Sequence, residues 1–79
     1  MHTLNLLGLA IRVARSHAST RRGHDMHATA WANNARTFAR CRDSAFGEGD
    51  PKRAASWDAM RARAARLARA HEILASDLH

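Results

Sequence analysis

The stretch GEGDP, at residues 47–51, constrains the fold of this 79-residue chain more than any other. A glycine such as Gly47 can adopt the left-handed conformation that ends a helix, and Asp50 can cap the helix that follows. Pro51 suits a first helical position, where its missing N–H has no partner to lose. One helix therefore ends here and another begins. Because so short a link makes neighbouring helices antiparallel, the sequence predicts a helical hairpin.

The helix after this break, about 51–78, has a seam of six apolar residues and one histidine, spaced alternately by three and four positions. This spacing is typical of a helix that packs along a partner helix. His71 occupies the seam, where a buried histidine could act as a pH-sensitive or register-fixing element. A position at the rim near the helix end is the interpretation that we favour, because the helix dipole stabilises a cation there. The seam consists of Trp57, Met60, Ala64, Leu67, His71, Leu74 and Leu78.

The segment of about 26–46 is predicted to be the first helix of the hairpin, after a break at STRRGH (19–24) and with Asp25 as its cap. Its proposed inward face is made of Trp31, Ala35, Phe38, Cys41 and Ala45.

The later helix is predicted to overhang the earlier one by about two turns, roughly 10 Å. Ile73, Leu74 and Leu78 then need cover from the N-terminal segment or from a second chain. These three residues and His71 are therefore the predicted protein interface, and we expect a homodimer.

Residues of about 3–18 fit either a helix or an alternating strand. Length, alanine content and the lack of a partner strand favour a short helix packed across the hairpin. An acid-free, arginine-bearing start is also typical of a transit peptide or an interfacial membrane helix, but the apolar run is shorter than the about 20 residues that span a bilayer. We expect one small all-α domain over residues 1–79 and no membrane partner. The inward helical face is predicted to contain Leu4, Leu7, Ile11, Ala14 and Ala18.

Alanine supplies 18 of the chain's 36 hydrophobic residues, so helices form easily but the core is thin. Cys41 is the only cysteine, which excludes an internal disulfide and fits a reducing compartment such as the cytoplasm.

A zinc site made of His17, His24, His27 and Cys41 can be drawn, but it lacks the paired cysteines that make zinc motifs specific. Surface histidines at a helix start are the favoured interpretation, and we expect no metal and no cofactor. The sequence contains no nucleophile motif and no phosphate-binding glycine loop, so we expect a protein that is not an enzyme.

The net charge of +6, with a pI near 11.5, is typical of a protein that binds nucleic acid or another acidic partner. The stretch RARAARLAR (61–69) shows its arginines on the helix half opposite the seam, with Asp58 and Glu72 in reach of two of them as i,i+3 pairs. GC-rich codon usage gives the same arginine and alanine bias, so a solvated helix face is the alternative. The arginines predicted to contact the partner are Arg61, Arg63, Arg66, Arg69, Arg36 and Arg40.

Two functions follow from these features. The first is a non-catalytic basic protein that docks electrostatically on nucleic acid or a nucleoprotein complex, without sequence preference because its aromatic residues lie mainly on the apolar seams. The second is a small phage or mobile-element regulator that inhibits a host protein complex, in the manner of an anti-defence protein, through contacts of its helix faces.

Overall fold

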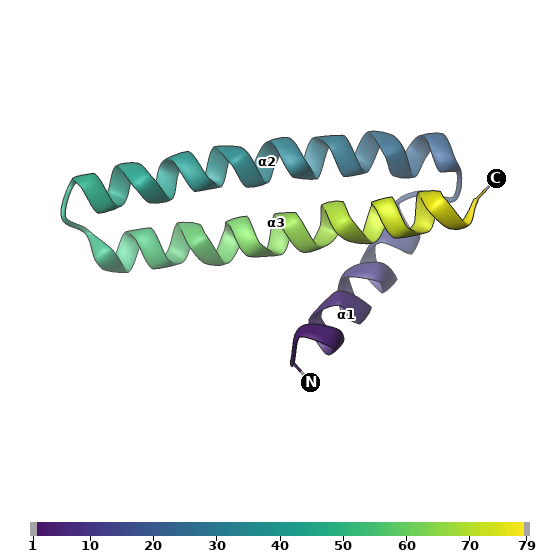
Figure 1. The fold of residues 1–79 in the computed structure, drawn as a ribbon, viewed down its shortest axis with the longest axis horizontal. Helices are drawn as coiled ribbons and strands as arrows, with labels where there is room; N and C mark the ends of the chain where they lie inside the picture. Colours follow the sequence, from purple (N-terminus) through teal and green to yellow (C-terminus); the bar gives the residue numbers. More distant parts are fainter. Residues whose placement is uncertain (1, 79) are drawn as a thin grey trace.

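The computed structural model describes residues 2–78, and the side chains of residues 6–78. It contains three helices, α1 (His2–His17), α2 (Arg21–Gly47) and α3 (Pro51–Asp77). Helices α2 and α3 lie side by side along their whole length, while α1 packs against α3 and diverges from the hairpin toward its N-terminal end (Figure 1). The predicted all-α hairpin is confirmed. Within residues 2–78 there is no strand, so the strand alternative for the N-terminal segment is wrong.

The turn between α2 and α3 uses most of the predicted signals. The Asp50 side chain accepts a hydrogen bond from the Arg53 backbone N–H at 3.0 Å, and Pro51 opens the helix. The prediction for Gly47 is wrong, because this glycine is the last residue of α2. Gly49 instead adopts the left-handed conformation, with φ of 76°, which reverses the chain after the helix has ended.

Helix α2 begins at Arg21, about five residues before the predicted start, and Asp25 is not its cap. Thr20 caps the helix from an extended backbone, with φ of −115° and ψ of 155°, and its hydroxyl accepts a hydrogen bond from the Gly23 N–H at 3.0 Å. A Cβ at Gly23 would lie 3.1 Å from Ala18 Cβ and from Thr20 Oγ1. Gly23 therefore allows a tight connection between α1 and α2 and does not break the helix.

The predicted overhang of the third helix is wrong, because α2 and α3 each contain 27 residues. Leu74 is consequently buried and Ile73 is half-buried, whereas Leu78 keeps 37% of its surface exposed. The rim position favoured for His71 is also wrong, because its exposed fraction is 0%. The early start of α2 removes the overhang, since it gives the end of α3 a partner along its full length, and α1 adds cover because Leu74 clusters with its Ala10 and Ala14.

The interface between α2 and α3 is lined mainly by alanine, which lets the two helices approach closely but buries little apolar area. Phe38 and Trp57 add one aromatic pair, with ring centroids 5.9 Å apart. Met60, predicted in the seam, has 46% of its surface exposed, so the seam is fully buried only from Ala64 to Leu74. Apart from Ala70, which packs against α1, the buried alanines of the hairpin are Ala28, Ala45, Ala54, Ala64, Ala68 and Ala75.

Helix α1 covers the second half of α3. Ala10 and Ala14 of α1 are buried in one cluster with Leu67, Ala70 and Leu74 of α3, flanked by Ile11 and Trp31. The predicted inward face is confirmed where side chains are described, because Ala14 is buried and Leu7, Ile11 and Ala18 are half-buried. The side chain of Leu4 lies outside the described residues. The other side of α1 has no cover within the described chain: Leu6, Leu9 and Val13 are exposed.

Candidate functional site

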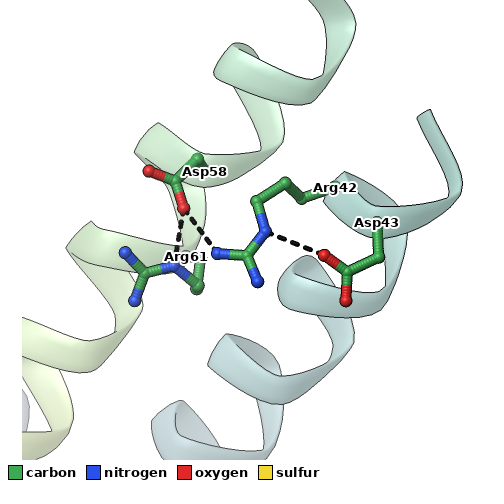
Figure 2. A network of polar contacts seen from close by, with 4 residues as sticks. All are labelled: Arg42, Asp43, Asp58 and Arg61. Atoms are coloured by element: carbon green, nitrogen blue, oxygen red, sulfur yellow. Dashed lines mark hydrogen bonds and ion pairs between the residues drawn. The ribbon is translucent and has the colours of Figure 1, made fainter. Parts of the chain in front are cut away.

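One of the predicted arginines is held inside an ion-pair network that joins the two hairpin helices. Asp58 Oδ1 accepts hydrogen bonds from Arg61 Nε and from Arg42 Nη1, both at 2.8 Å (Figure 2). Arg42 Nε also donates to Asp43 Oδ1 at 3.1 Å. Arg61 is therefore paired with a carboxylate of its own helix and is half-buried, so it is less exposed than predicted.

The network keeps its members charged. Hydrogen bonds from Arg61, and next from Arg42, hold the pKa of the Asp58 carboxyl below its ordinary value. The hydrogen bonds that Arg42 donates to Asp58, and next to Asp43, raise the pKa of Arg42. Because these groups are partly open to water, the network contributes modestly to stability. It pairs two arginines, Arg42 and Arg61, with carboxylates of the same chain.

The remaining predicted arginines are more available to a partner. Arg69 is exposed and pairs with Glu72 at 3.3 Å, and the pairings of Arg69 with Glu72 and of Arg61 with Asp58 confirm the predicted i,i+3 pairs. Arg36 is exposed and donates to the Asn33 side chain. Arg40 and Arg63 are exposed and Arg66 is half-buried, and none of these three forms an ion pair with a carboxylate among the described residues.

A cleft of about 310 Å³ lies between α1 and α3. Ala10 and Leu67 form its buried part, with exposed fractions of 7% and 5%. Arg63 and Arg66 line its α3 side, and aliphatic side chains line its α1 side. The aliphatic residues are Leu6, Leu9 and Val13, with exposed fractions of 41%, 53% and 40%.

The histidines gather where the three helices meet. His24 of α2 and His71 of α3 are buried, with their Nδ1 atoms 2.8 Å apart. The ring of His27 stacks on His71 at a centroid distance of 4.9 Å, and His17 of α1 lies 6.0 Å from His27. We call these four residues the histidine junction. The interpretation of His24 as a surface histidine is wrong, because only 2% of its surface is exposed.

Burial dominates the chemistry of His71. Burial, followed by the proximity of His27, His24 and His17, lowers the pKa of His71 to about 4. Its Nε2 atom is buried without a hydrogen-bond partner among the described residues. The 2.8 Å contact with His24 requires one Nδ1 to carry a proton and donate it in a hydrogen bond that the other, unprotonated Nδ1 accepts. The neutral pair therefore uses opposite ring tautomers.

The predicted protein interface does not form one exposed surface. Of its four residues, Leu74 and His71 are buried and Ile73 is half-buried, which leaves only Leu78 exposed.

The described residues contain no group of three or more histidine, cysteine or acidic side chains placed to hold a metal ion, and Cys41 lies apart from the histidine junction as a free, half-buried thiol. None of the helices formed by residues 2–77 is both long and apolar enough to cross a bilayer.

The cleft and the histidine junction were both missed from the sequence. Leu6, Leu9 and Val13 follow i, i+3 and i+7 spacing, so their common side of a helix was readable. The sequence does not determine which side of α1 faces α3, because both sides are apolar. The approach of His71 to His24 has no local signal, since the two residues are 47 positions apart.

Comparisons of the chain with protein-family models, with curated proteins and with solved structures find no match.

Proposed function

We propose that this protein is a non-catalytic basic binding protein that docks electrostatically on nucleic acid or on a nucleoprotein complex. One observation carries the proposal: the chain has thirteen basic residues and a net charge of +6, and in the described chain only Arg42, Arg61 and Arg69 have a carboxylate partner. The unpaired cations are free to exchange their counterions for phosphates.

The proposed contacts are Arg63, Arg66 and Arg69 on α3 and Arg36 and Arg40 on α2. The guanidinium of Arg61 is already paired with Asp58, so Arg61 adds positive charge to this surface but does not offer a free guanidinium to a phosphate. The stacked aromatic pair of the hairpin is half-buried and cannot stack on bases, and Phe46, with 63% of its surface exposed at the hairpin turn, lies apart from the arginines of mid-α3. Binding should therefore depend on phosphate contacts, with little sequence preference and a steep salt dependence.

Fluorescence anisotropy with labelled duplex and single-stranded oligonucleotides, between about 50 and 200 mM salt, tests this function. Replacing Arg61, Arg63, Arg66 and Arg69 together with glutamine should abolish binding while circular dichroism shows an intact fold. The matched control replaces Arg12, Arg15, Arg21 and Arg22, which removes the same charge from the other end of the chain. Equal losses of nucleic-acid affinity in the two variants would show that binding depends on total charge and not on the arginines of α3. Absence of binding by the unaltered protein at physiological salt would refute the proposal.

A second candidate function is a small regulator that inhibits a host protein complex through helix-face contacts, as expected of a phage or mobile-element protein. The exposed aliphatic residues of α1 favour it, because Leu6, Leu9 and Val13 offer apolar contacts that nucleic acid does not use. Affinity purification from the native host, with and without nuclease, separates the two functions. A protein partner that is retained after nuclease treatment and is lost in the Leu9→Glu variant supports the second function.

Homodimerisation and a cytoplasmic location remain predictions. The sequence predicts a dimer on Leu74, Ile73 and Leu78, and of these three residues Leu78 alone is exposed. Sedimentation equilibrium of the protein and of a Leu78→Asp variant tests whether the remaining exposed leucine supports self-association. The location rests on the single cysteine, Cys41, which suits a reducing compartment.

A further inference from the structure

The cleft between α1 and α3 combines an apolar stripe with a basic edge. Leu6, Leu9 and Val13 form the stripe on α1, and Arg63 and Arg66 form the edge on α3. Helix α1 diverges from the hairpin toward its N-terminal end (Figure 1), and the cleft that it forms with α3 has a volume of about 310 Å³. Exposed apolar stripes of this kind mark surfaces that bind a partner, particularly in a chain with so few large side chains to bury.

The charges around the cleft restrict its occupant. No carboxylate lines it, and α1 contains no acidic residue. A second copy of the chain, docked on the same surface by a two-fold axis, would bring Arg63 and Arg66 toward the same arginines of its partner. Nucleic acid supplies phosphates for the arginines but leaves the leucines uncovered. The complementary occupant is both apolar and acidic.

We propose that this cleft binds an acidic amphipathic α-helix of a partner protein. The partner helix presents large apolar residues at i, i+3 or i+4, and i+7 to Leu6, Leu9 and Val13, and carboxylates at its flank to Arg63 and Arg66. Arginine pairs with carboxylates through two parallel hydrogen bonds, which fixes the direction of the helix in the cleft. The inference rests on the second candidate function and names the chemistry of its partner.

A displayed library of helical peptides, with leucine, phenylalanine, glutamate and lysine allowed at each outward position, tests the proposal with the full 79-residue protein. Selected peptides should carry glutamates beside an apolar stripe. Leu9→Glu should weaken their binding by about tenfold or more, as expected for a central apolar contact. Met26→Glu is the matched control, because Met26 is an exposed apolar residue, with an exposed fraction of 65%, on another helix.

Charge reversal gives a readout that a purely structural role would not produce. Selection on a protein with Arg63→Glu and Arg66→Glu should enrich lysine-bearing peptides in place of glutamate-bearing ones. A protein with Arg36→Glu and Arg40→Glu, which carries the same change in charge on α2, should keep the preference for glutamate. Circular dichroism and thermal midpoints of all variants verify that each protein is folded.

Other results would overturn the inference. Peptides whose binding survives Leu9→Glu but fails with Leu78→Glu would move the docking site and leave the second function standing. Enrichment of no helical peptide would contradict both. Two measurements test other occupants of the cleft. Binding to phosphatidylserine vesicles that is lost on Leu9→Glu would assign the cleft to a lipid surface. Concentration-dependent sedimentation that is lost on Leu9→Glu would assign it to a second copy.

Discussion

The Nδ1 atoms of His24 and His71 lie 2.8 Å apart, so two residues 47 positions apart in the chain form a buried contact between the start of α2 and the end of α3. His71 is the largest side chain that is fully buried among the described residues. A buried set that is otherwise alanine and leucine therefore includes two ionisable side chains, His24 and His71. Its imidazoles can keep this contact only while at least one Nδ1 is unprotonated.

Stability should fall in mild acid because of His71. Its pKa in the folded protein is about 4, below the ordinary value of 6.5, so the unfolded chain binds the proton more readily. The contribution is fully present above pH 6.5 and is lost as the pH falls toward 4. The free energy of unfolding should decrease by up to about 1.4 kcal/mol per pH unit in this window. Urea unfolding at a series of pH values measures this slope.

The groups that face His71 set the controls for this experiment. His24 and His27 of α2 and His17 of α1 surround it. His71→Leu should flatten the slope, whereas His17→Gln, which changes an exposed member of the histidine junction, should keep most of it. An unchanged slope in the His71→Leu protein would show that another group causes the acid sensitivity.

The packing of α1 on α3 should tolerate no larger side chain. Ala14 and Ala70 both have exposed fractions of 0% within the same cluster. Ala70→Leu should destabilise the protein by about 1–3 kcal/mol, because added methylenes must displace neighbours in a packed core. Ala65→Leu places the same side chain on an exposed position of α3 and should change the free energy of unfolding by at most about 0.5 kcal/mol. Equal effects would mean that α1 does not pack against α3 as described.

The two candidate caps of α2 should respond differently to alanine. Thr20→Ala should cost about 1 kcal/mol, because it removes the hydroxyl that accepts the Gly23 N–H. Asp25→Ala should cost only a few tenths, about 0.3 kcal/mol, since this residue lies inside the helix and contributes through the helix dipole alone. Chemical denaturation of both variants measures the difference. A larger loss for Asp25→Ala would restore the later helix start predicted from the sequence.

The turn glycines provide a second comparison. Gly49→Ala should destabilise the hairpin by about 1 kcal/mol, because its φ of 76° is unfavourable for a residue with a Cβ. Gly47→Ala should be neutral or stabilising by up to about 1 kcal/mol, since Gly47 is helical and a Cβ there meets no atom within 4 Å. Thermal unfolding of both variants tests the assignment, and the reverse order of stability would contradict it.

The difference between predicted and observed structure has a specific physical origin. Asp50 and Pro51 act through local chemistry, so their roles followed from the sequence and are confirmed. The start of α2 did not, because Thr20 and Gly23 lie in a polar stretch whose composition is typical of a break between helices. That error of about five residues shortened the predicted α2, created the false overhang of α3 and placed His71 at the rim. The histidine junction and the cleft depend on where α1 docks, which no local spacing determines.

Releasing the arginines of the ion-pair network should strengthen nucleic-acid binding, if the proposed function holds. Asp58→Asn removes the carboxylate that accepts from Arg42 and Arg61, and thus frees Arg61 for phosphates and leaves Arg42 paired with Asp43 alone. Asp77→Asn makes the same change in net charge at an exposed carboxylate that forms no ion pair within the described chain. The plot of log affinity against log salt for duplex DNA should steepen by about 0.9 for each arginine that gains a phosphate. Asp58→Asn should therefore steepen it more than Asp77→Asn. Equal slopes would place the bound nucleic acid away from Arg42 and Arg61, because charge alone would then explain both variants.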